Sequence, residues 1–90
     1  MENWDPNRGL RRKTWLMIII ESYDALKCNL MRGRWDAGSA VEIRVRPFEG
    51  EAPGESLMVM DGMNVTTSDE VPPNELWVIQ ADGTHLTTTI

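Results

Sequence analysis

The sequence is poor in the residues from which catalytic and metal centres are built. Its 90 residues include one cysteine and one histidine, so no disulfide can form within the chain and no pair of thiolates is available to a structural zinc ion. No residue near Cys28 in the sequence indicates an activated thiolate. His85 follows a turn, and the sequence shows no nucleophile that it could activate as a general base. We therefore predict a protein that is not an enzyme, that needs no cofactor or metal, and that resides in a reducing, cytoplasmic compartment.

Long apolar runs are also missing. The longest, Trp15 to Ile20, spans six residues and ends at Glu21, whereas a membrane span needs about 20 apolar residues and a signal-peptide core about 7 to 15. We predict a soluble protein without a membrane segment. Because the run is rich in β-branched residues and is bounded by polar ones, we interpret it as a strand that is buried on both faces.

Positive charge is absent from the second half of the chain. All nine lysines and arginines lie at or before Arg46, together with six acidic residues, while eight acidic residues and no basic ones follow it. The two halves therefore carry +3 and −8, which gives the net charge of −5. If they form separate faces, the molecule is a dipole that can stack on copies of itself or dock on a basic partner. If they interleave in one fold, the charges neutralise each other, and the sequence leaves both arrangements open.

Turn signals divide the chain after residue 40 into short strands. Asp61-Gly62 predicts a hairpin between strands 56–60 and 63–67, and Asp82-Gly83 predicts a second one between strands 76–81 and 85–90. Loops rich in proline and glycine separate these elements, at residues 47–56 and 68–74. A chain that ends at Ile90 on a strand residue predicts an open sheet edge there.

A central strand and its partner follow from alternation. Val41, Ile43 and Val45 alternate with charged residues, which is the clearest strand pattern in the chain. If Trp35 lies opposite Val41 across a short loop, Met31 lies opposite Val45, and Arg32, Arg34, Arg44 and Arg46 share one solvent-facing side.

Residues 22–33 fit two structures. Leu26, Cys28 and Leu30 alternate as in a strand, which is the structure we predict, while Ser22 is a suitable cap for a helix that stops at Gly33. We predict a mainly β fold: an N-terminal arm of residues 1–13, then a single domain of residues 14–90, a small antiparallel barrel or sandwich of about six strands. The alternative is an α+β fold with one helix near residues 22–33.

The acidic half suggests a protein-binding surface. The leading prediction is a protein-interaction module, either self-assembling as a homo-oligomer or directed at a host protein as an inhibitor. Residues 71–79 are similar to the loop-into-strand entry in β-sandwich components of phage virions, and a virion-like role is one form of the self-assembling prediction. The surface would comprise the acidic residues Glu49, Glu51, Glu55, Asp61, Asp69, Glu70 and Glu75.

Nucleic acid is the alternative partner. Cations and aromatic residues are interleaved as in proteins that bind single strands, although the net negative charge is the opposite of what such proteins usually carry. The residues of this alternative site are Arg11, Arg12, Lys13, Trp15, Arg32, Arg34, Trp35, Arg44 and Arg46.

Overall fold

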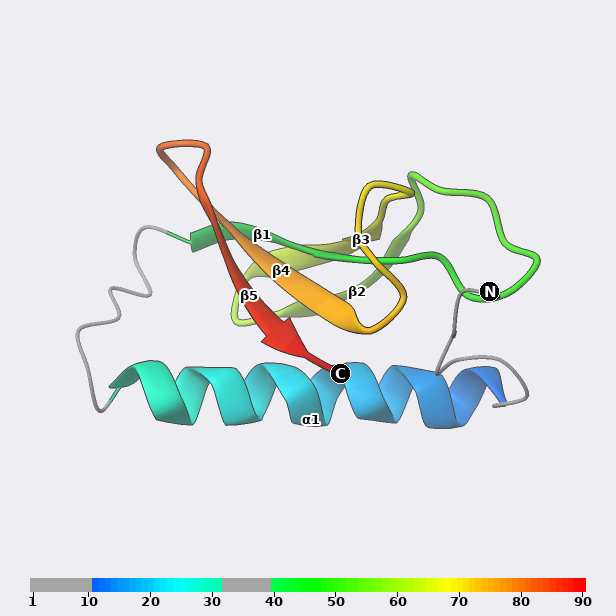
Figure 1. Ribbon diagram of the computed structural model, residues 1–90, viewed down its shortest axis with the longest axis horizontal. Coiled ribbons are helices and arrows are strands. Elements are labelled where there is room, and N and C mark those ends of the chain that lie inside the picture. The colour runs from blue at the N-terminus through cyan, green and yellow to red at the C-terminus, as the bar shows by residue number, and fades with distance from the viewer. Residues whose placement is uncertain (1–10, 32–39) are drawn as a thin grey trace, which may run out of the picture.

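A helix, α1 (Arg12–Met31), lies along one face of an open five-stranded sheet (Figure 1). The computed structural model describes residues 11–31 and 40–90. The strands are β1 (Ala40–Val45), β2 (Ser56–Met60), β3 (Met63–Thr67), β4 (Glu75–Gln80) and β5 (His85–Thr89). A mainly β fold is thus confirmed, and because the sheet is open and a helix covers it, its form is the predicted α+β alternative and not a closed barrel.

The sheet is built around β1, the strand whose alternation was clearest. The strand order is β2-β3-β1-β4-β5. β1 is parallel to β3 and antiparallel to β4, while β2 with β3 and β4 with β5 form antiparallel hairpins on either side of it. Both predicted hairpins are confirmed, and so is the position of the last strand at an edge of the sheet.

The turns explain why the hairpins could be found from local sequence. Asp61 and Gly62 both have positive φ, at 51° and 79°. That conformation belongs to the type I′ turn, whose twist matches that of the two flanking strands and which Asp-Gly and Asn-Gly favour. Register in the β2–β3 hairpin is therefore set at Met60 and Met63, which lie opposite each other.

The predicted strand over Trp15–Ile20 is wrong, because these residues belong to α1. Trp15, Ile19, Tyr23 and Leu26 recur at helical spacing and are buried against the sheet, whereas Met17 retains 53% of its surface exposed. The strand predicted within residues 22–33 is also wrong, because residues 22–31 belong to α1. Residues 32 and 33 lie outside the described residues. Of the predicted arm, Arg12 and Lys13 form the first turn of α1, and residues 1–10 are not among those described.

The predicted partner of β1 needs the same correction. Both sides of β1 are occupied, by β3 and by β4, and Met31 lies in α1 and not opposite Val45. Arg32, Arg34 and Trp35 lie outside the described residues. The prediction assumed that consecutive elements pair, whereas the observed neighbours are more distant in sequence.

The core lies between α1 and the sheet. Trp15 and Ile19 pack there with Ile43, Val45 and Val78, all with no exposed surface. The ring of Trp15 also contacts Phe48 in the loop after β1, with ring centroids 5.1 Å apart. No helix within residues 11–31 and 40–90 is long and apolar enough to cross a bilayer.

Candidate protein-interaction surface

The face of the sheet turned away from α1 is uncovered by any helix of the described chain (Figure 1). Side chains alternate along a strand, so the residues next to the core positions project onto this face. They are mostly polar, in contrast to the core side. The face carries Glu42, Arg44, Asn64, Thr66, Glu75, Trp77, Ile79, His85, Thr87 and Thr89.

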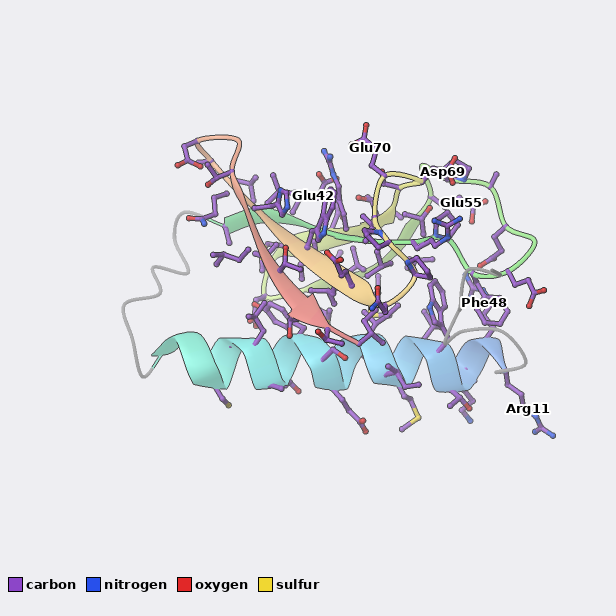
Figure 2. The ribbon with its side chains drawn as sticks, viewed as in Figure 1. Arg11, Glu42, Phe48, Glu55, Asp69 and Glu70 are labelled. Carbon is purple, nitrogen blue, oxygen red and sulfur yellow. The ribbon has the colours of Figure 1, made fainter. Side chains whose placement is uncertain are left out.

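A fixed polar network occupies the centre of this open face. Arg44 Nε donates to Glu42 Oε1 at 2.9 Å, and the hydroxyl of Thr66 on β3 donates to Glu42 Oε2 at 2.7 Å. Both carboxylate oxygens of Glu42, which is labelled in Figure 2, are thereby engaged. The network ties β1 to β3 and holds the guanidinium of Arg44 close to an acid.

An aromatic pair joins the last two strands. The rings of Trp77 and His85 stack with centroids 4.1 Å apart and an interplanar angle of 15°, and Trp77 Nε1 donates to Glu75 Oε1 at 3.0 Å. The pair forms a flat platform beside the outer edge of the sheet. The sequence prediction did not include this pair. The register of the Asp82-Gly83 hairpin places Trp77 opposite Thr87, which is two residues from His85 on the same face of the strand.

The outer edge of β5 carries backbone groups without a strand partner. Gln80 N–H donates to Thr84 C=O at 2.8 Å, and Ile90 N–H donates to Asn74 C=O at 2.9 Å. Since bonded and non-bonded residues alternate in an antiparallel pair, the backbone groups of the odd-numbered residues of β5 point away from β4. These residues are His85, Thr87 and Thr89, and within the described chain no strand lies beyond them.

The acidic and basic halves of the chain interleave. Arg12 Nε on α1 contacts both carboxylate oxygens of Glu51 at 3.1 Å. Near the other end of α1, Lys27 Nζ lies 2.8 Å from Asp61 Oδ2, which also accepts a 2.7 Å hydrogen bond from the hydroxyl of Tyr23. Two of the seven predicted acidic residues are therefore paired with the helix and are not part of a free acidic surface.

The other five predicted acids lie in three places. Glu49 and Asp69, together with Glu51 and Arg46, line a hollow of about 240 Å³ beside Phe48. Glu55 and Glu70 are exposed on the neighbouring loops. Figure 2 labels Glu55 near Asp69, and Glu70 nearer the middle of the view. Glu75 lies on the open face, bound to Trp77.

The basic residues of the alternative site are dispersed. Arg11 precedes α1, is exposed and points away from the sheet in Figure 2. Lys13 is exposed two residues further on, and Arg12 is paired with Glu51. Trp15 has no exposed surface and offers no ring face to a base. Arg44 lies on the open face, Arg46 lines the hollow, and the remaining three residues lie outside those described.

Asp61 couples the titration of three side chains. Hydrogen bonds from Lys27 and Tyr23 lower the pKa of its carboxyl group. The hydrogen bond to Asp61, followed by the charge of Asp61, raises the pKa of Lys27. Burial, followed by the hydrogen bond to Asp61, raises the pKa of Tyr23. At the other hairpin, the hydroxyl and then the backbone N–H of Thr84 lower the pKa of Asp82 without a basic partner.

These shifts predict how stability depends on pH. The lowered pKa values of Asp61 and Asp82 stabilise the fold above the ordinary carboxyl pKa of about 3.9, and this contribution is lost as the pH falls through the lowered values. The raised pKa values of Tyr23 and Lys27 stabilise it below about pH 10, and this contribution is lost as the pH rises beyond their ordinary values. We expect Asp61→Asn to flatten both limbs of the curve of unfolding free energy against pH, as measured by urea unfolding.

Asp82→Asn is the matched control, because its partners are Thr84 groups that do not titrate in this range. It should flatten the acid limb alone. Asparagine suits the positive φ of residue 61, so the turn is kept in Asp61→Asn. An alkaline limb of unchanged slope in that variant would contradict the coupling of Asp61 to Tyr23 and Lys27.

Comparison with known proteins gives no relative: no protein-family model, no curated protein and no solved structure matches the chain.

Proposed function

We propose that this protein is a non-enzymatic protein-interaction module, which binds an extended segment of a partner protein by strand addition at β5. The observation that carries the proposal is the row of outward backbone groups on His85, Thr87 and Thr89. An incoming strand would satisfy these groups with main-chain hydrogen bonds, as in other cases of β-strand addition.

Within the described chain, the edge at β5 lacks three of the features that commonly protect a free edge: proline, lysine and a bulge. The strand contains no proline and no lysine, and its pairing with β4 runs over five positions without a bulge. At the opposite edge, the pairing of β2 with β3 shifts between Ser56 and Met58. Since a bulge twists an edge away from a docking strand, β5 is the better of the two edges.

The charge around β5 favours a basic segment. The edge belongs to the half of the chain that has no lysine or arginine. Asp82 lies in the turn that leads into β5, and Glu75 pairs with Thr89 near its end. Lysine or arginine side chains at alternate positions of a docked strand would meet these carboxylates, which favours basic over acidic partners. A basic surface of a host protein or of a virion component would meet this requirement.

The test uses two synthetic peptides of eight residues, one alternating lysine with valine and one alternating glutamate with valine. We expect the lysine peptide to bind with protection of the amides of residues 85, 87 and 89 from hydrogen exchange, followed by NMR. The glutamate peptide should bind at least about tenfold more weakly. Absence of binding, or protection confined to β2, would contradict the proposal.

Thr87→Pro tests the edge itself. Proline removes an N–H that points outward, so it costs no bond to β4 and is tolerated at an edge, but it removes one bond to the peptide. We expect the affinity for the lysine peptide to fall about tenfold. Thr87→Val, which keeps the N–H and the β-branched shape, should bind like the unchanged protein, and circular dichroism shows whether both variants are folded.

The nucleic-acid alternative is tested by the same protein with single-stranded oligonucleotides. Arg44 and Trp77 are each bonded to a glutamate on the open face, so a phosphate that approached them would meet negative charge. Quenching of tryptophan fluorescence at low salt that disappears as salt is added would favour nucleic acid over peptide.

A further inference from the structure

The outer face of α1 carries a stripe of four exposed residues, Lys13, Met17, Ile20 and Asp24. Their spacing of four, three and four residues places them within an arc of about 60° on a helix, on the side away from the buried Trp15 and Ile19. Met17 and Ile20 are 53% and 39% exposed, although both are large and apolar. The stripe therefore has an apolar centre, a basic end and an acidic end.

The charged ends of the stripe are available for an intermolecular contact. Within the part of the chain that the structure describes, neither Lys13 nor Asp24 forms an ion pair. Their neighbours on α1 differ in this respect, since Arg12 is bound to Glu51 and Lys27 to Asp61. The helix thus pairs the cations that face the sheet and leaves a cation and an acid on its outer face.

The order of the four residues is self-complementary. Lys13 and Asp24 lie at equal distances, on opposite sides, from the midpoint between Met17 and Ile20. Two copies of α1 that run antiparallel about a two-fold axis at this midpoint would place each Lys13 opposite the other copy's Asp24. The same axis would place each Met17 opposite the other copy's Ile20. A parallel arrangement would instead bring like charges together, which is unfavourable.

We infer that a second copy of this chain docks on the stripe, giving a two-fold symmetric dimer through antiparallel α1 helices. The contact buries the exposed apolar pair and supplies both charged ends with partners. A single pair of helices lies at the small end of the interface sizes that proteins use, so the dimer is weak and concentration-dependent. It leaves β5 and the open face of the sheet free, and it does not rest on the strand-addition proposal.

The experiment is sedimentation equilibrium of the full chain from about 10 μM to 1 mM, a range in which small interfaces associate. We expect the average mass to rise from 10.2 kDa toward twice that value. Ile20→Glu should weaken association at least tenfold, because it places a charge in the apolar centre. Ala25→Lys, which changes an exposed residue of α1 outside the stripe, should leave association unchanged.

A charge swap tests the antiparallel register. Lys13→Glu alone and Asp24→Lys alone should each weaken association, because each leaves two like-charged contacts. The double variant Lys13→Glu with Asp24→Lys restores opposite charges in the antiparallel dimer and should restore the association. Circular dichroism checks that each variant is folded. A protein that stays monomeric at 1 mM, a double variant as weak as the single ones, or a dimer abolished by Thr87→Pro would each overturn the inference.

Discussion

Replacing Trp15 by alanine should lower the free energy of unfolding by about 3 to 5 kcal/mol, the usual cost of removing a large buried aromatic side chain. Trp15 has no exposed surface, lies in the first turns of α1, and contacts Phe48 in the loop after β1. Its ring thus joins the start of the helix to the loop that follows the central strand. A domain of this length has a total stability of roughly 5 to 13 kcal/mol, so the variant should retain only a fraction of it in urea unfolding followed by circular dichroism.

Trp77→Ala is the matched control, since it removes the same side chain from the open face of the sheet. Trp77 is half-buried and its ring stacks on His85, so we expect a loss of about 1 to 2 kcal/mol. Trp15→Phe should also cost less than Trp15→Ala, because it keeps an aromatic ring and removes the buried Nε1, which has no hydrogen-bond partner among the described residues. Equal losses in Trp15→Ala and Trp77→Ala would contradict the assignment of Trp15 to the core.

The parts of the fold that the sequence predicts correctly are those set by local chemistry. The Asp61-Gly62 turn needs two residues that tolerate positive φ, and only the two turn residues decide it. β1 follows from alternation within six residues. Its partners could not be found in this way, because the parallel pairing of Ile43 with Val65 depends on how distant segments compete for the same edge.

The helix was missed because the apolar run in it has no period of its own. Every residue from Trp15 to Ile20 is apolar, and such a run fits a buried strand as well as a helix. The helical signal lies in the wider spacing of Trp15, Ile19, Tyr23 and Leu26, which are the buried residues of α1. The helical period becomes visible over the twelve residues from Trp15 to Leu26, and not over the six of the apolar run.

The candidate surface was only partly accessible to sequence reasoning. The count of charges indicated a basic first half and an acidic second half of the chain. Such a count cannot predict that α1 packs across the sheet. That placement brings Arg12 to Glu51 and Lys27 to Asp61, which pairs the two halves. The free edge of β5 was predicted from the last strand, whereas the direction of its backbone groups needed the register of the hairpin.

Ile19→Ala should lower the free energy of unfolding by about 2 to 5 kcal/mol, whereas Ile20→Ala should cost less than about 1 kcal/mol. The two residues are adjacent and identical, but Ile19 is fully buried against the sheet and Ile20 is 39% exposed on the outer face of α1. In a helix, consecutive side chains point about 100° apart, so only one of the two reaches the core.

The comparison of these two variants separates the helix from the strand that the sequence predicted. In a strand buried on both faces, neighbouring isoleucines would both lose packing, and the two variants would be destabilised to a similar extent. Urea unfolding at low micromolar protein concentration keeps association through Ile20 from adding to the stability of the unchanged protein. A difference of more than about 1 kcal/mol then follows from the helix alone, because the two substitutions remove the same atoms and differ only in the direction of the side chain.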